Sequence, residues 1–303
     1  MIQEYEVTGR IMRRLIAIIS VLMLVVITTA STNALPPEQT DAGALFGGQS
    51  SIANNTTTLA GELAEMPVIV EEYTATWCSN CVDVEVAIKN IADQENIKSY
   101  MFHRSIGETQ DPFGTDELDL RWESRYDRRA PPTAVFNGTE MKIGSVADGE
   151  NLEEDYTNMA RVPLPVEGTS TFSWTPNGMN SGMATWSNDM SEDIFPNSEI
   201  KAQIWIVETT AKFEEGTNGL EDYNKIVRNI FEFENFRNGS EIIQLPEAFD
   251  GDDLEVHLIY AEYPILITEE PVDDSEESSG LLPNLTILST MLAIIAASRF
   301  SKK

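Results

Sequence analysis

The sequence has few thiols, few imidazoles and few cations. Its 303 residues include only two cysteines, Cys78 and Cys81, and two histidines, His103 and His257. Because a structural zinc site needs about four such ligands, a lone cysteine pair and two histidines far apart in sequence argue against zinc, and we expect no metal site. Fifty acidic residues against 20 basic ones give a net charge of −30. Because a surface this acidic repels phosphate backbones and anionic lipid, it argues against nucleic acid as a partner.

Long apolar runs are confined to the two ends of the chain. Arg10, Arg13 and Arg14 precede an apolar run over residues 15–27, and small residues follow as far as Ala34. This order is typical of a secretory signal peptide, which we predict over residues 1–34. An uncleaved membrane anchor is the alternative.

The C-terminal apolar run, residues 281–298, is almost uncharged and precedes a basic tail at 299–303. We predict a single transmembrane anchor with a cytoplasmic tail, joined to the folded part by an acidic linker over residues 269–280. The alternative is a marginal span or a processed sorting signal. The prediction places the protein in the cell membrane as a single-pass protein, with its folded domains extracytoplasmic.

Two folded domains are expected between these ends. Residues 35–61 are rich in small and polar residues, which favours a flexible spacer. Periodicity over residues 62–163 predicts strand 67–74, helix 79–94, strand 98–106, helix 115–126, a hairpin over 133–146 and helix 149–159. Residues 164–268 contain six short strand patterns, over 168–174, 183–188, 199–209, 224–233, 241–245 and 254–261. The expected fold class is therefore an α/β domain followed by an all-β, sandwich-like domain.

The segment Trp77-Cys78-Ser79-Asn80-Cys81 follows the first predicted strand and opens the first predicted helix. This spacing brings two sulfurs within bonding distance, and the unpaired N–H groups at a helix N-terminus favour the thiolate of the first cysteine. The pattern indicates thiol-disulfide exchange. Its alternative is an inert structural disulfide, which exported domains often keep.

The order of elements, the Trp-Cys-x-x-Cys segment and Ala130-Pro131-Pro132-Thr133 before the next strand together resemble the thioredoxin fold, over about residues 62–163. The resemblance implies that Cys78 attacks, Cys81 resolves, Pro132 is a cis-proline facing the disulfide, and Glu72 is a buried carboxylate that exchanges a proton with Cys81. Trp77, Pro131, Pro132 and Thr133 would face the substrate. The dipeptide Ser79-Asn80 departs from the family's usual pair, so the direction of electron flow stays open.

Four arginines, at positions 121, 125, 128 and 129, precede Pro132. Pairing with Glu117 and nearby acids on a solvated helix is the favoured interpretation for Arg121 and Arg125. For Arg128 and Arg129, that interpretation and a cationic rim beside Cys78 stay equally open.

The second half contains Ile204-Trp205-Ile206-Val207-Glu208 and Tyr223-Asn224-Lys225-Ile226-Val227-Arg228, which resemble exported Omp28-like proteins. We expect Glu208 and Arg228 to pair across strands.

The hypothesis for function is an extracytoplasmic, membrane-anchored oxidoreductase acting on thiols and disulfides of exported proteins. It would need no cofactor and would exchange electrons with a membrane redox partner. Two alternatives are a surface adhesion protein with a structural disulfide, and a redox-inactive peptide-binding protein.

Overall fold

The computed structural model describes residues 34–178 and 180–265. Their strands are β1 (Glu38–Gln39), β2 (Leu45–Ile52), β3 (Thr57–Glu62), β4 (Val68–Thr74), β5 (Ile97–His103), β6 (Thr133–Phe136), β7 (Glu140–Ile143), β8 (Thr169–Pro176), β9 (Ser181–Asn188), β10 (Ser198–Lys212), β11 (Asp222–Phe233), β12 (Asn238–Gln244) and β13 (Leu254–Pro264). The α-helices are α2 (Ser79–Ala92), α3 (Asp116–Tyr126) and α4 (Leu152–Ala160), and Leu63–Glu65 and Glu192–Ile194 form short 3-10 turns.

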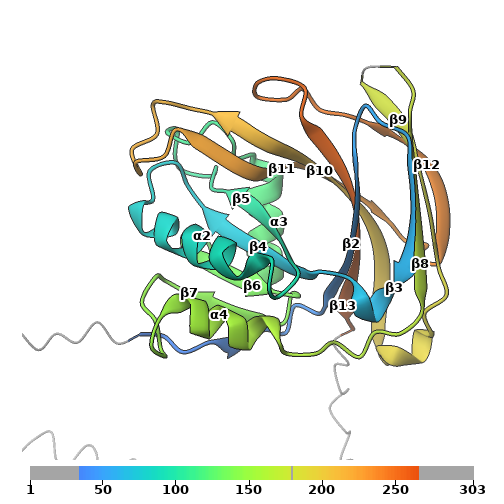
Figure 1. Ribbon diagram of the computed structural model, residues 1–303, viewed down its shortest axis with the longest axis horizontal. Coiled ribbons are helices and arrows are strands. Elements are labelled where there is room, and N and C mark those ends of the chain that lie inside the picture. The colour runs from blue at the N-terminus through green and yellow to red at the C-terminus, as the bar shows by residue number, and fades with distance from the viewer. Residues whose placement is uncertain (1–33, 179, 266–303) are drawn as a thin grey trace, which may run out of the picture. The chain divides into compact units, whose positions relative to one another are not determined.

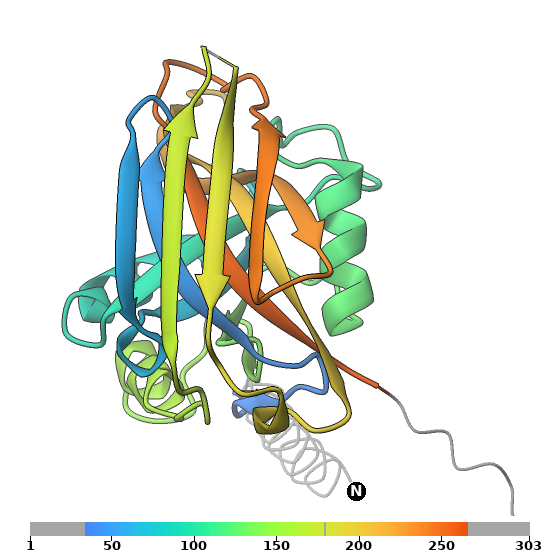
Figure 2. The ribbon, with the colours of Figure 1, turned by 90° about the vertical axis from the view of Figure 1, so that its right-hand side faces the viewer.

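Two sheets organise these elements (Figures 1 and 2). The larger has nine strands in the order β1-β7-β6-β4-β5-β11-β10-β13-β2, and the smaller has four in the order β12-β9-β8-β3. Strand β4 runs parallel to β5 and antiparallel to β6, with Glu72 opposite Met101 on β5 and Ala134 on β6. The β-α-β-α-β-β-α order expected for residues 62–163 is confirmed, and so are the six strands expected in the second half.

The helices begin where side chains cap their first turns. Thr115 accepts a hydrogen bond from the Leu118 backbone N–H at the start of α3, and Asn151 accepts one from Glu154 at the start of α4. Such caps satisfy amide groups that have no partner within the helix. Asp127, in a left-handed conformation, ends α3. These local signals explain why the sequence located the helices well.

Helices and the smaller sheet cover both faces of the nine-stranded sheet. Helices α2 and α4 pack on one face of its first half, around Val70, Ala134 and Tyr156. The four-stranded sheet packs on the second half, with Trp174 and Trp186 against strands β10 and β13. Helix α3 covers the opposite face, and Figure 2 shows it behind the smaller sheet, at the right of the view.

The core beneath α3 spans both halves of the chain. Trp122 of α3 lies in one cluster with Tyr100 and Phe102 of β5 and with Trp205 of β10. Edge-to-face contacts join the Trp205 ring to the rings of Tyr100 and Phe102, with centroids 5.0 and 5.4 Å apart. Residues on both sides of position 163 thus bury their apolar surface in the same core.

This arrangement corrects the predicted fold class. The described chain is mostly β, and it is not an α/β domain followed by an independent all-β sandwich, because one sheet runs through both segments. Residues 34–265 fall within one compact unit. A parallel pairing of β5 with β11, at Met101 and Ile226, joins the two parts.

The predicted flexible spacer, residues 35–61, is also wrong. It supplies both edge strands of the larger sheet: β1 pairs with β7 and β2 pairs with β13. It also supplies β3, which pairs with β8 at the edge of the smaller sheet. Gly47 and Gly48 have positive φ values of 107° and 91°, next to a shift in register between β2 and β13. The glycines and other small residues of this segment therefore form an irregular strand and not a linker.

None of the helices among the described residues is long and apolar enough to cross a membrane. Residues 1–33 of the predicted signal peptide, the linker at 269–280, the anchor at 281–298 and the tail at 299–303 all lie outside the described residues.

Candidate active site

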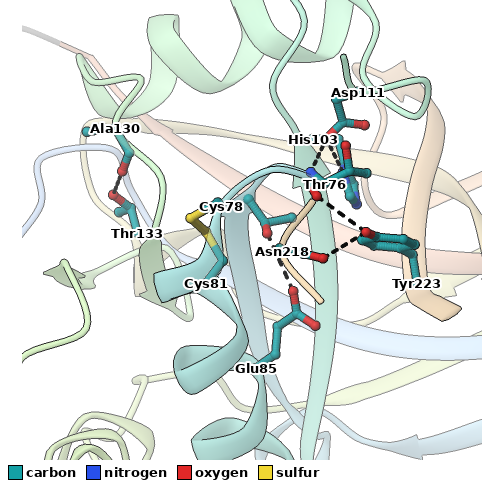
Figure 3. The surroundings of a disulfide bond; sticks show 11 residues. Thr76, Cys78, Cys81, Glu85, His103, Asp111, Ala130, Thr133, Asn218 and Tyr223 are labelled. Carbon is teal, nitrogen blue, oxygen red and sulfur yellow. Dashed lines mark hydrogen bonds and ion pairs between the residues drawn. A yellow bond between two sulfur atoms is a disulfide. The ribbon is translucent and has the colours of Figure 1, made fainter. Parts of the chain in front are cut away.

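Cys78 and Cys81 form a disulfide where β4 leads into α2 (Figure 3). Their sulfurs are 2.04 Å apart. Cys78 is the residue just before the first turn of α2 and has an extended backbone, and Cys81 lies within that turn. Cys78 is 6% exposed and Cys81 only 1%. The sulfur at the helix N-terminus is therefore also the one nearer the surface, as an attacking thiolate requires.

A tight turn carries the chain from β4 into this helix. The Cys78 N–H donates to the Ala75 carbonyl at 2.9 Å, and the Cys81 N–H donates to the Cys78 carbonyl at 3.2 Å. Ala75 packs with both cysteines in a small apolar cluster, and Trp77 lies against it. These backbone hydrogen bonds set the path of the chain through the turn that carries both cysteines.

The segment between β5 and α3 holds Trp77 and Thr76 in place. The Trp77 Nε1 donates to Glu108 Oε2 at 2.5 Å. The Thr76 N–H donates to Asp111 Oδ2 at 2.8 Å, and His103 Nδ1 lies 2.7 Å from the same oxygen. A buried acid–imidazole pair therefore stands directly behind the residues that precede Cys78.

A third segment, the loop between β10 and β11, contacts the same turn. The backbone N–H groups of Thr217 and Asn218 donate to the Thr76 carbonyl at 2.9 and 3.0 Å. The Tyr223 hydroxyl lies 3.4 Å from that carbonyl and donates to Asn218 Oδ1 at 2.8 Å. The second half of the chain thus takes part in positioning the Trp77-Cys78 turn.

On the other side of the disulfide in Figure 3 lies the Ala130–Thr133 segment. The peptide bond between Pro131 and Pro132 is cis, as the resemblance implied. Thr133 Oγ1 donates to the Ala130 carbonyl at 2.6 Å, and the Pro132 carbonyl accepts a hydrogen bond from Gly144 N–H at 2.8 Å. These bonds hold the proline turn at the start of β6.

Glu72 lies on the face of β4 that α2 and α4 cover, and it is 2% exposed. Neither of its carboxylate oxygens has a hydrogen-bond partner. Burial raises its pKa well above the usual value, and the nearby Glu85 carboxylate raises it further. A carboxyl group in this state keeps its proton at neutral pH more readily than an exposed glutamate does.

Glu85, on α2, is a second acid in this region, and the sequence analysis missed it. Burial raises its pKa, while the charge of His103 and a hydrogen bond from Thr74 Oγ1 at 3.4 Å lower it. Its position one helical turn after Cys81 was a signal that the sequence did offer, because residues i and i+4 share a helix face. Glu108, Asp111, Asn218 and Tyr223 gave no comparable signal.

Arg121 and Arg125 of α3 do not pair with Glu117 or nearby acids on a solvated face, so that interpretation is wrong for these two. It does describe Arg129, which pairs with Glu123 of α3. Arg121 lies 2.7 Å from the buried Glu71 carboxylate, and Arg125 donates to the Gly43 carbonyl at 2.7 Å. Arg128 pairs with Glu38 at 3.1 Å. Arg129 lies 3.4 Å from Glu123 and 3.6 Å from Asp119. All four therefore contact groups within the chain.

The expected cross-strand pair is confirmed, since Arg228 Nη1 lies 3.5 Å from Glu208 Oε2. Within residues 34–178 and 180–265, no three His, Cys, Asp or Glu side chains gather as metal ligands.

The chain is similar in sequence to a thioredoxin, and it also aligns with solved structures. The chain is 31% identical over 98 residues to Thioredoxin-1 of Drosophila melanogaster, a region that covers 32% of this chain and 80% of the fly protein. A crystal structure of an Agrobacterium tumefaciens protein aligns over 68% of this chain and 98% of its own, at 13% identity and a TM-score of 0.40, too low to support an argument. No family model matches the chain. The resemblance to Omp28-like proteins stays a prediction.

Proposed function

This chain belongs to the thioredoxin family, and we propose that it is a thiol-disulfide oxidoreductase whose reacting pair is Cys78 and Cys81. The observation that carries the proposal is the placement of this disulfide at the N-terminus of α2, with Cys78 just before the first turn and Cys81 within it. Once the pair is reduced, the unpaired N–H groups at this helix N-terminus would stabilise a thiolate at Cys78.

The order of the reaction steps follows from the exposure of the two cysteines, because Cys78 is more accessible to a substrate than Cys81. In reduction of a substrate disulfide, the Cys78 thiolate attacks one substrate sulfur and the other leaves as a thiolate. Cys81 then gives its proton to Glu72 and attacks the Cys78 sulfur, which re-forms the Cys78–Cys81 bond and releases the second substrate thiolate. The reverse sequence oxidises a dithiol. The reaction needs no organic cofactor, because the two electrons pass to or from a partner thiol pair.

Trp77 and Pro131 are half-buried, and we propose that a substrate peptide meets them, with the buried Pro132 and Thr133 beneath. Trp77 packs against the disulfide cluster, and its indole N–H is held by Glu108. Pro131 and Pro132 are close to Thr133, where β6 begins. We propose that an extended substrate segment approaches from the proline side, because the β10–β11 loop already occupies the Thr76 carbonyl on the opposite side.

We further propose that the substrates are exported proteins, that the protein acts on the outer side of a cell membrane, and that a membrane redox protein renews its redox state. The sequence supports this with the basic and apolar residues before position 34 and with its strong acidic charge. Protease treatment of intact cells, followed by detection of the folded part, tests the location. Digestion without lysis is expected, and protection until lysis would contradict an outer location.

The reduction potential of the Cys78–Cys81 pair tests the proposed activity. The full-length protein is equilibrated with glutathione buffers of graded ratio, and its thiols are trapped and counted. A potential between about −120 and −270 mV is expected, the range of exchanging enzymes, and its value indicates whether the protein oxidises or reduces. A potential below about −300 mV would mean a structural disulfide, as in the adhesion hypothesis. The variant with both cysteines changed to serine is the matched control.

A further inference from the structure

Glu72 is buried, yet its proposed role requires it to exchange protons with water. A group that exchanges a proton with Cys81 must also exchange it with water, once in each cycle. Glu72 is 2% exposed and neither carboxylate oxygen has a hydrogen-bond partner. Its neighbours across the sheet are Met101 and Ala134, which carry no proton-transfer group. A route from Glu72 to the surface must therefore run through the helices that cover it.

Two ionisable groups face Glu72 from those helices. Tyr156 of α4 is fully buried, and burial together with the charges of Glu72 and Asp155 raises its pKa, so it stays a neutral phenol. Glu85 of α2 is only half-buried, and its charge acts directly on Glu72. Of these two, Glu85 is the one whose side chain is partly exposed, and its carboxylate acts on Glu72 by its charge.

The placement of Glu85 suits transfer between Cys81 and solvent. It follows Cys81 by one turn of α2, so the two side chains lie on the same helix face. Thr74, two residues after Glu72 on the same face of β4, donates a hydrogen bond to Glu85 Oε1 at 3.4 Å. His103, at the end of β5, is a further ionisable group that acts on Glu85. These contacts hold the Glu85 carboxylate over the same patch of β4 that carries Glu72.

We propose that Glu85 is the relay through which Glu72 gains and loses its proton. The inference rests on the proposed function and adds a second acid to its site. In the resolving step, the Cys81 thiol gives its proton to the Glu72 carboxylate, and the Cys81 thiolate attacks Cys78 as the substrate thiolate leaves. Glu72 then passes the proton to Glu85, which releases it to water. When an incoming thiolate opens the disulfide, a proton travels the same path inward to Cys81.

Ellman's reagent separates the two steps of the cycle in one experiment. Reduced full-length protein is mixed with the reagent in a stopped-flow instrument over pH 5–9. The first released thionitrobenzoate reports attack by Cys78, and the second reports attack by Cys81 on the mixed disulfide. Glu85→Gln is compared with Asp83→Asn, because Asp83 is an exposed acid on the same helix. Glu85→Asp restores the acid with a shorter side chain.

The second phase of Glu85→Gln is expected to fall at least 10-fold at its plateau, and to fall further in D₂O, while its first phase equals that of the wild type. Asp83→Asn is expected to leave both phases unchanged, and Glu85→Asp to recover part of the second. A plateau equal to that of the wild type, with only the pH midpoint displaced, would overturn the relay, since Glu85 would then act by its charge alone. If the wild-type protein releases neither equivalent, the proposed function itself fails, and this result is distinct from the other two.

Discussion

The ion pair between Arg121 and Glu71 gives the sharpest test of how the fold is held together. The Glu71 side chain is 1% exposed, and Arg121 Nη1 lies 2.7 Å from its Oε1. The Tyr126 hydroxyl donates to the other oxygen. The Arg121 guanidinium also lies 4.9 Å from the ring of Phe102 and 5.0 Å from that of Trp205. One side chain of α3 thus bridges β4, β5 and β10.

Replacing Arg121 with leucine keeps apolar contact with the two rings but leaves the Glu71 charge buried without its cation. Loss of one partner of a buried ion pair costs about 3–5 kcal/mol. With a urea m-value of about 2–3 kcal/mol/M, we expect the unfolding midpoint of Arg121→Leu to fall by about 1–2.5 M. The unfolding of the full-length protein is followed by tryptophan fluorescence and by circular dichroism.

Two further variants control this measurement. The double variant Glu71→Gln/Arg121→Leu removes the stranded charge, so it should be more stable than Arg121→Leu alone. Arg161→Ala breaks the pair with Glu95, in which the arginine side chain is 66% exposed, and should leave the midpoint near that of the wild type. A loss below about 1 kcal/mol in Arg121→Leu would refute the view that this pair fastens α3 to both halves of the sheet.

Two other predictions concern the β10–β11 loop and a buried histidine. A Cβ on Gly216 would lie 2.0 Å from the Tyr223 hydroxyl. Gly216→Ala should therefore displace the β10–β11 loop from Thr76 and lower the free energy of unfolding by about 1–3 kcal/mol. An unchanged urea midpoint would contradict this. Burial lowers the pKa of His257 from 6.5 to about 4, so the unfolded chain binds this proton first and stability falls as the pH drops from about 6.5 toward 4. Between pH 6.5 and 5, the free energy of unfolding should therefore rise with pH by up to about 1.4 kcal/mol per unit because of His257, and His257→Phe should remove this dependence. Urea titrations at each pH measure it, and an unchanged dependence in the variant would mean that other groups cause it.

The sequence predicted the redox part of the site because its signals are local. Cys78 and Cys81 are three residues apart, Glu72 is six residues before Cys78, and Pro132 directly precedes the next strand. Helix caps and alternating apolar residues placed the elements between them. The thioredoxin resemblance then connected these positions, and the structure shows the disulfide, the buried acid and the cis-proline.

The parts that the sequence did not predict depend on contacts between distant segments. The Thr76 carbonyl is held by Thr217 and Asn218, and no local pattern connects those positions. Strand β2 was taken for a spacer because its glycines weaken the strand pattern, while its partner is β13 at the other end of the folded chain. The predicted fold class was wrong for the same reason, because the pairing of β5 with β11 joins the strands of the two expected domains into one sheet.

The two edges of the nine-stranded sheet come from neighbouring pieces of chain, β1 and β2, with only residues 40–44 between them. The arrangement determines when this sheet can be completed during synthesis of the chain. Strand β2 is among the first to leave the ribosome, yet its sheet partner, β13, is the last strand of the described chain to appear. Long-range pairings of this kind form slowly and late. The nine-stranded sheet therefore cannot be completed until β13 has been synthesised, and β2 stays without its only strand partner in this sheet until then.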